Sequence, residues 1–177
     1  MKAIKARKDK VTLDSRSGTE GWLEGMALCT IFRGHAAFVS PHEVSINGET
    51  LSAERIFVNV GGRANVPPMP GLDKVSYLTN SSIMDIDFLP DHLVIVGGSY
   101  IGLEFAQMYR RFGAKVTVVE KSSRLISRED PDVSDTIKAI LDEEGIAFRL
   151  DAECISFSPH TDGVCVHVDC PSGDRDV

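Results

Sequence analysis

The chain has 177 residues, of which 42% are hydrophobic and 25% charged, an ordinary composition for a globular protein with a buried core. The 26 acidic residues outnumber the 19 basic ones, and the net charge of −7 would repel a phosphate backbone, which argues against nucleic-acid binding. We find neither a signal peptide nor an apolar stretch that could span a membrane, and therefore expect a cytoplasmic protein. Four irregularly spaced cysteines favour reduced thiols over a disulfide framework.

The first part of the chain predicts a helix followed by small antiparallel strands. The helical stretch ends near Gly21 to Met26, and two short apolar runs, Cys29 to Phe32 and Ala36 to Val39, have the composition of strands. Asn47-Gly48 lies between alternating apolar residues, which is typical of a two-residue hairpin turn. This part of the chain therefore predicts an antiparallel β-meander.

A domain boundary is predicted near residue 70. The run Arg55 to Gly62 is almost continuously apolar and stops at a glycine pair, which is typical of a strand buried on both faces. Residues 67–71 read Pro-Pro-Met-Pro-Gly, and successive prolines remove backbone donors and predict a linker. We therefore divide the chain into domains of residues 1–70 and 71–177.

Beyond this boundary the pattern predicts a strand, a helix and a second strand. Leu93 to Val96 is a buried strand, and Ile101 to Phe112 has apolar residues at helical spacing. Lys115 to Glu120 is a second, β-branched strand, and such a βαβ unit almost always has parallel strands. The fold class is therefore α/β, with a Rossmann-like nucleotide-binding unit. The elements predicted after it are a helix at Asp132 to Glu144, a strand at Ile146 to Leu150 and an antiparallel hairpin from Cys154 to Val168.

A glycine-rich turn between the first strand and the helix is the predicted site. Gly97 makes the tight turn, Gly102 lets the helix pack closely on the sheet, and the helix N-terminus offers unpaired N–H groups to a pyrophosphate. Ser99 replaces the middle glycine of the usual pattern, and either its Cβ is tolerated or its hydroxyl bonds a phosphate. The predicted cofactor-binding residues of this turn are Gly97, Gly98, Ser99, Tyr100, Ile101 and Gly102.

An acid follows the second strand at the spacing found in dinucleotide-binding proteins. Glu120 lies 23 positions after Gly97, close to the roughly 20 expected of a carboxylate that accepts hydrogen bonds from an adenosine ribose. Such a carboxylate repels a 2′-phosphate, which favours NAD over NADP, although Lys121 and Arg124 would partly offset the repulsion. The alternatives are an ordinary βα turn and a methyltransferase, which also places a glycine turn and an acid in these positions.

The end of the chain contains Cys165, His167 and Cys170. Side chains five positions apart on a strand point to opposite faces, which argues against a redox pair of Cys165 and Cys170. The same geometry argues against a metal site made by His167 and a cysteine. We therefore expect solvent-facing side chains here and predict no metal site.

The sequence resembles the FAD-containing pyridine nucleotide-disulfide oxidoreductases, the family of dihydrolipoamide dehydrogenase, glutathione reductase and mercuric reductase. The stretches that carry the resemblance are Ile56 to Arg63, Leu93 to Ala106, Val116 to Glu120 and Arg128 to Val133. The resemblance implies that electrons pass from a reduced nicotinamide to FAD and then to a cysteine pair that reduces a small-molecule substrate. It implies an enzyme that forms a homodimer as a full-length protein.

The resemblance also implies roles for individual residues. Tyr100 corresponds to a mobile aromatic residue that covers the flavin, and Glu104 to a carboxylate that pairs with a lysine beside it, which makes these two the predicted catalytic residues. Gly61 and Gly62 would close the FAD domain near the flavin. The residues implied to hold NAD are Gly97, Ser99, Gly102 and Glu120, with Lys121 adjacent.

The chain departs from the family pattern at both ends. Family members begin with an FAD-binding glycine motif and a Cys-x4-Cys pair, and end with a dimerisation domain, whereas this sequence contains none of these. We therefore expect a central fragment that binds a nucleotide weakly and has no activity alone. The alternative from another class is a non-catalytic nucleotide-binding or redox-sensing module.

Overall fold

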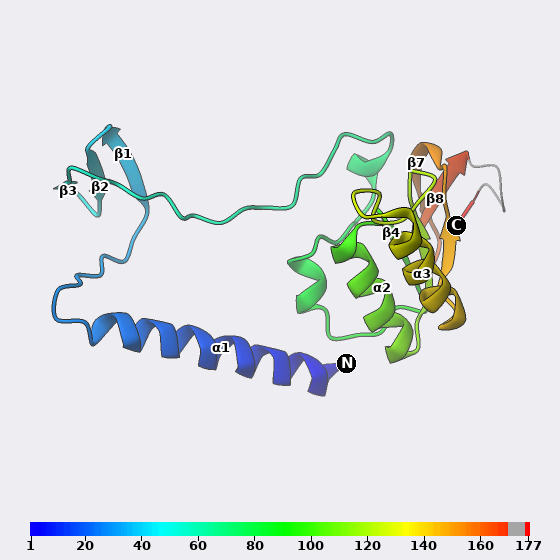
Figure 1. Ribbon diagram of the computed structural model, residues 1–177, viewed down its shortest axis with the longest axis horizontal. Coiled ribbons are helices and arrows are strands. Elements are labelled where there is room, and N and C mark those ends of the chain that lie inside the picture. Colours follow the sequence, from blue (N-terminus) through cyan, green and yellow to red (C-terminus); the bar gives the residue numbers. More distant parts are fainter. Residues whose placement is uncertain (170–175) are drawn as a thin grey trace. The chain divides into compact units, whose positions relative to one another are not determined.

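The computed structural model describes residues 1–169 and 176–177 of the chain. These residues form two compact units, one of residues 6–63 (the N-terminal unit) and one of residues 1–5 and 64–177 (the C-terminal unit). The elements are α1 (Lys2–Glu24), β1 (Ala36–Ser40), β2 (Glu43–Ile46), β3 (Glu49–Ser52), the short 3-10 helices η1 (Leu72–Lys74) and η2 (Ser82–Asp85), β4 (His92–Val96), α2 (Tyr100–Phe112), β5 (Lys115–Val119), α3 (Pro131–Glu143), β6 (Ala147–Arg149), β7 (Glu153–His160) and β8 (Gly163–Asp169) (Figure 1).

The N-terminal unit contains most of α1 and an antiparallel meander in the order β1-β2-β3. The predicted hairpin turn is confirmed, since Asn47 and Gly48 both have positive φ, at 51° and 86°, as a tight two-residue turn requires. Helix α1 buries none of its side chains. Of the helices in the described part of the chain, none is long and apolar enough to cross a membrane.

Two strands predicted for this unit are absent from the described residues. The run Cys29 to Phe32 forms no strand, and the segment before β1 is held instead by the side chain of Asn47, whose amide donates to the carbonyl of Arg33 at 2.7 Å. The run Arg55 to Gly62 forms no strand either, and its Phe57 is 89% exposed. An apolar run becomes a buried strand only where neighbouring strands pair with it, and no described strand pairs with this one.

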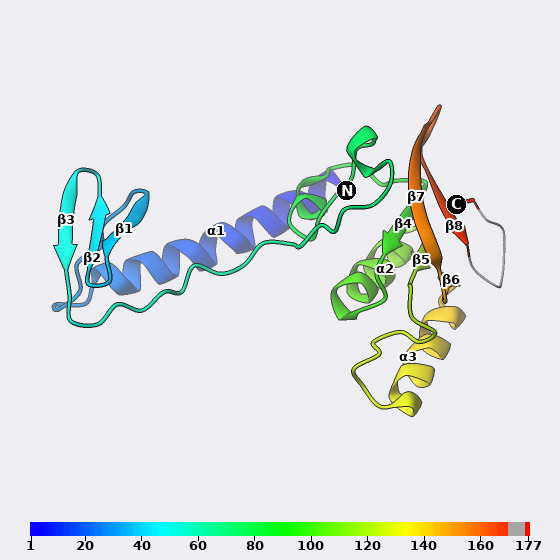
Figure 2. The same cartoon turned by 90° about the horizontal axis from the view of Figure 1, so that it is seen from above.

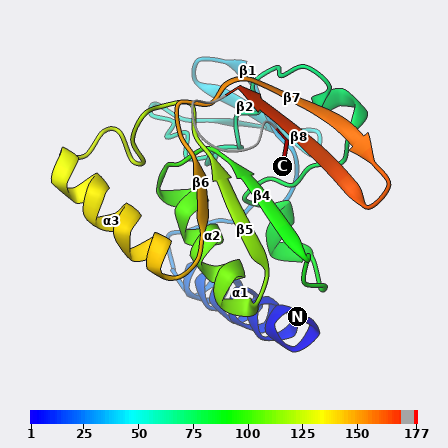
Figure 3. The ribbon, with the colours of Figure 1, turned by 90° about the vertical axis from the view of Figure 1, so that its right-hand side faces the viewer.

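The C-terminal unit is built on a parallel sheet in the order β4-β5-β6, which confirms the α/β fold class (Figure 3). Strand β5 pairs with β4 from Lys115 opposite His92 to Val119 opposite Val96. The predicted helix between them is α2, which ends at Gly113 with a φ of 110°, the left-handed conformation that favours glycine after a helix. The βαβ unit therefore forms where its local pattern predicts it.

Alternate residues of β5 contribute to two hydrophobic cores. Val116 and Val118 are buried against α2 and α3, whereas Val119 is buried with Val166 and Val168 of β8. The two helices thus cover one face of the sheet, and the antiparallel hairpin β7-β8 lies over the other (Figure 2). Burial on both faces explains why Val116 to Val119 are all β-branched and three of the four are valine.

Tyr109 fixes α2 against the segment that precedes the sheet. Its buried hydroxyl donates to the carbonyl of Ile83 at 3.1 Å, and burial raises the pKa of this hydroxyl, which remains a neutral donor. We expect Tyr109→Phe to lower the free energy of unfolding by about 1–2 kcal/mol, because a buried carbonyl loses its partner. Urea unfolding measures this loss. Tyr77→Phe, at an exposed tyrosine, is the matched control and should change stability by less than about 0.5 kcal/mol.

The predicted hairpin at the end of the chain is confirmed as β7 and β8, but one inference drawn from its geometry is wrong. Cys165 and His167 are two positions apart on β8 and therefore share a face, with Sγ of the cysteine 3.9 Å from Nδ1 of the histidine. The argument from opposite faces holds for residues five apart and does not apply to this pair. Cys170 lies outside the described residues.

Candidate dinucleotide-binding site

The glycine turn lies where β4 ends and α2 begins. Gly97 leaves the strand with a φ of 116°, and its N–H donates to the carbonyl of Val119 at 2.8 Å. A Cβ added to Gly102 would lie 2.3 Å from the carbonyl oxygen of Gly97 and 3.3 Å from Cγ2 of Ile95. The first turn of α2 therefore packs against the end of β4 too closely for any side chain at this position.

The N-terminus of α2 presents backbone donors. Ser99 is the N-cap, with φ −87° and ψ 171°, and its carbonyl accepts the N–H of Leu103 at 3.0 Å. The Ser99 side chain makes no capping hydrogen bond to the described residues, so the first N–H groups of the helix are not satisfied in that way. These groups and the helix dipole give this end a partial positive charge, which suits an anionic ligand.

Glu120 folds back over the glycine turn from the end of β5. One carboxylate oxygen accepts the N–H of Gly98 at 2.6 Å, and the other accepts the N–H of Ser122 at 2.7 Å. A Cβ at Gly98 would lie 3.1 Å from both Cβ and Cγ of the glutamate, so glycine permits this approach. Two parallel strands end here, and their carboxyl edge is where α/β sheets bind ligands.

A cleft of about 760 Å³ opens along α2 beside the turn. It is lined by Gly98, Ser99, Tyr100, Leu103, Glu104, Gln107, Glu120, Arg124, Ile126, Ser127, Arg128, Glu129, Ile137, Ile140 and Leu141. The structure thus brings Gly98, Ser99 and Glu120 together at one end of the cleft. Ile101, Gly102, Gly97 and Lys121 do not line it, and Gly61 and Gly62 belong to the N-terminal unit.

Tyr100 and Glu104 lie one helical turn apart on the face of α2 that borders the cleft. Tyr100 is 65% exposed and Glu104 is also exposed. Within the described part of the chain, Glu104 forms no ion pair with a lysine. The two side chains are therefore free to meet a group outside the chain.

The later part of the segment between β5 and α3, from Ile126 to Glu129, lines the cleft and was not predicted as a part of the site. Its Ile126 donates its N–H to the carbonyl of Gly98 at 2.9 Å and has a φ of 39°, which a β-branched residue rarely adopts. Arg128 of the same segment lines the cleft. The available signal was positional, because the segment follows a parallel strand at the sheet edge that binds ligands.

Helices α2 and α3 are tied together at the far end of the cleft. The guanidinium of Arg111 donates to both carboxylate oxygens of Glu144, at 2.6 and 2.9 Å, and the Gln107 amide adds a third bond at 2.7 Å. The hydrogen bond from Arg111 is the largest of the effects that hold the pKa of Glu144 below its ordinary value. The carboxylate therefore stays charged, and the spacing of the two helices is fixed.

Residues 3–175 match the family described as pyridine nucleotide-disulphide oxidoreductase. The chain belongs to this family. The match extends over both units and includes the glycine turn, the cleft and Glu120.

Individual relatives agree with this assignment. The chain is 35% identical to the probable pyridine nucleotide-disulfide oxidoreductase RclA of Escherichia coli strain K12, over 91% of this chain and 38% of the relative. It is also 35% identical to a mercuric reductase of Bacillus cereus, over 66% of this chain and 18% of the relative. The solved structure of the HOCl-induced flavoprotein disulfide reductase RclA from Escherichia coli superimposes with a TM-score of 0.86 at 34% identity, over 95% of this chain and 39% of that one. The chain thus spans less than two fifths of the length of these relatives.

Proposed function

We propose that residues 64–177 form the nicotinamide-dinucleotide-binding domain of a flavin-dependent oxidoreductase. In this enzyme electrons pass from NAD(P)H through FAD to a disulfide or a related small acceptor. One observation carries the proposal: the N-terminus of α2, the glycine turn and the anchored Glu120 carboxylate meet at the carboxyl edge of a parallel sheet. Membership of the oxidoreductase family supports the same function.

We assign different residues of the cleft to the pyrophosphate and to the adenosine ribose of the dinucleotide. The backbone N–H groups at Ser99 and Tyr100 would receive the pyrophosphate, and the Glu120 carboxylate the adenosine ribose. Each carboxylate oxygen accepts one backbone N–H and has a second lone pair for a ribose hydroxyl. The negative charge disfavours a 2′-phosphate, so we propose NAD as the preferred cofactor even though Arg124 lines the same cleft.

Tyr100 and Glu104 are the residues of the C-terminal unit that we assign to the flavin side of the reaction. FAD, when bound to the full-length protein, accepts a hydride from the nicotinamide and passes electrons on. The exposed Tyr100 ring can cover an apolar cofactor surface and swing aside, and Glu104, one turn along, can hold a cationic group in place. We assign Gly61 and Gly62 of the N-terminal unit to the FAD-binding region. Both glycines are exposed in this structure.

The proposal also includes the cellular location, the oligomeric state and the substrate class of the full-length enzyme. We propose a cytoplasmic enzyme, which fits the free thiols of the three described cysteines, Cys29, Cys154 and Cys165. We propose a homodimer because the family resemblance implies a dimerisation domain beyond these residues. We propose a small-molecule substrate rather than a nucleic acid, because the net negative charge of the chain would repel a phosphate backbone.

A titration of the 177-residue chain with reduced nucleotides tests the proposal. We expect NADH to bind with a Kd on the order of 0.1–1 mM, and NADPH at least about five-fold more weakly. Isothermal titration calorimetry measures both values, with S-adenosylmethionine as the third ligand. Tighter binding of S-adenosylmethionine than of NADH would reassign the cleft to a methyltransferase. If NADH binds but the full-length protein does not oxidise it in a flavin-dependent reaction, the protein would be a non-catalytic nucleotide-binding or redox-sensing module.

A further inference from the structure

The outer face of β8 carries polar and sulfur-containing side chains next to one another. Val166 and Val168 of this strand are buried against the sheet, so the alternate residues Cys165 and His167 point to the opposite face. Both are partly buried. A thiol and an imidazole that share a face, two positions apart, can act on the same ligand.

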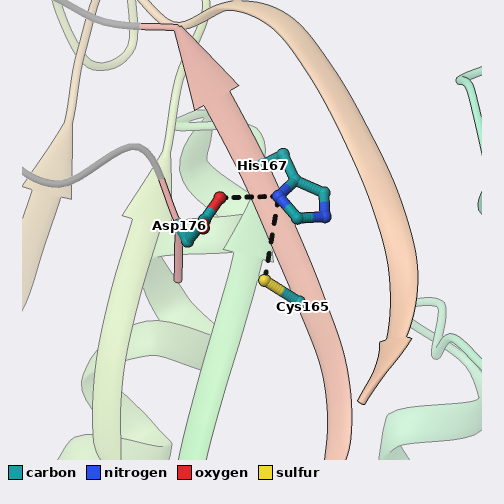
Figure 4. Close-up of side chains that lie close together, drawn as sticks. All are labelled: Cys165, His167 and Asp176. Carbon is teal, nitrogen blue, oxygen red and sulfur yellow. Dashed lines mark hydrogen bonds and ion pairs between the residues drawn. The ribbon is translucent and has the colours of Figure 1, made fainter.

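The last two residues add a carboxylate to this pair. Val166 and Val177 exchange both backbone hydrogen bonds, at 2.7 and 2.9 Å, and a bridge aligns His167 with Asp176. This pairing places Oδ1 of Asp176 2.6 Å from Nδ1 of His167, on the side where Sγ of Cys165 lies (Figure 4). The carboxylate is therefore positioned by the backbone of β8 and does not depend on side-chain packing.

We propose that Cys165, His167 and Asp176 form a three-ligand site for a divalent transition-metal ion of the zinc class. Their ligand atoms Sγ, Nδ1 and Oδ lie within 4.8 Å of one another, and one ion with bonds of about 2.0–2.3 Å can reach all three. A set of sulfur, nitrogen and oxygen ligands suits zinc and disfavours magnesium or calcium, which prefer oxygen alone. The Asp176 side chain is 66% exposed, which leaves a fourth position for water.

A neighbouring residue orients the imidazole for this role. Nε2 of His167 lies 2.8 Å from Oγ of Ser158 on the adjacent strand β7. A metal-bound imidazole typically donates its second ring N–H to such an acceptor, which fixes the tautomer and directs the other nitrogen at the metal. With the ion bound, Nε2–H would donate to Ser158 and Nδ1 would direct its lone pair at the metal, whereas without the ion Nδ1–H donates to the Asp176 carboxylate.

The charges of the cluster also favour a cation. Binding replaces the S–H bond with a bond from sulfur to the metal and releases the proton to solvent, without a change of oxidation state. The bound ion then offsets the negative charges of the thiolate and the carboxylate in one place.

Metal titration of the 177-residue chain, reduced and freed of metal with a chelator, tests the proposal. We expect one equivalent of Zn²⁺ to bind by calorimetry, and one equivalent of Co²⁺ to produce a thiolate-to-cobalt absorption band. Cys165→Ser, His167→Gln and Asp176→Asn should each weaken Zn²⁺ binding by about ten-fold or more, and Cys165→Ser should abolish the band. Circular dichroism in chelator confirms that each variant is folded.

Two matched variants separate this site from adventitious binding. Cys154→Ser removes an exposed thiol of β7, and His160→Gln removes an exposed histidine at the hairpin end, so neither should change the Zn²⁺ affinity. The proposal fails if the chain binds no stoichiometric Zn²⁺, because the pair of His167 and Asp176 is then an ordinary hydrogen bond. It also fails if the cobalt band survives Cys165→Ser or disappears in Cys154→Ser.

Discussion

Gly102→Ala is expected to weaken NADH binding by about ten-fold or more, because displaced N–H groups lose charge-assisted hydrogen bonds to the pyrophosphate of about 1.5–3 kcal/mol each, and about 1.4 kcal/mol is ten-fold in affinity. The added Cβ would lie 2.3 Å from the carbonyl oxygen of Gly97, a backbone atom that cannot rotate away. Helix α2 must then move away from β4, and its first N–H groups move with it. The same overpacking should lower the free energy of unfolding by about 1–3 kcal/mol.

Calorimetric titration with NADH and urea unfolding measure these two effects of Gly102→Ala separately. Gly21→Ala is the matched control, since a Cβ there meets no atom within 4 Å and the residue lies inside α1. That control should leave NADH binding unchanged and add up to about 1 kcal/mol of helix stability. Wild-type NADH affinity in a folded Gly102→Ala protein would show that the turn does not position the pyrophosphate.

The βαβ unit could be predicted from the sequence because its signals are local. The apolar run that forms β4, the helical spacing of α2 and the glycine that ends it are each contained in a short window. The tight hairpin at Asn47 and Gly48 is local in the same sense. In each case the residues that specify the element are the residues that form it.

The run Arg55 to Gly62 shows where such reasoning fails. Its composition predicts a buried strand, yet in the described chain Phe57 is 89% and Val60 87% exposed. Burial of a strand depends on partner strands, and composition cannot report whether those are present. The segment has the side chains of a core strand without a neighbour to pair with.

The candidate site could likewise be predicted only where its residues are specified by local sequence patterns. The spacing between Gly97 and Glu120 indicated that an acid would lie near the turn, and the carboxylate does accept the N–H of Gly98. The approach of Ile126 to the carbonyl of Gly98 had no local sequence signal beyond the position of its segment after a parallel strand, because it depends on the path of an irregular segment. Asp176 likewise reaches His167 only through pairing of the chain end with β8.

Glu120→Gln is expected to weaken NADH binding about ten-fold and to reduce the preference for NADH over NADPH. The carboxylate accepts backbone N–H groups with both oxygens, whereas the amide has only one acceptor, so either Gly98 or Ser122 loses its partner. A hydrogen bond to a charged group contributes about 1.5–3 kcal/mol, and ten-fold in affinity corresponds to about 1.4 kcal/mol. The 2′-phosphate of NADPH also meets one negative charge fewer.

Titration of two further variants with NADH and NADPH separates the effect of the Glu120 charge from the effect of its side-chain length. Glu129→Gln removes a negative charge from the same cleft without touching the turn, and it should change both affinities by less than about two-fold, as expected for an exposed charge. Glu120→Asp keeps the charge but shortens the side chain, so NADPH should stay disfavoured while NADH binding falls. Equal NADH affinities for the wild type and Glu120→Gln would contradict the assignment of this carboxylate to the ribose, since its loss would then leave the dinucleotide unaffected.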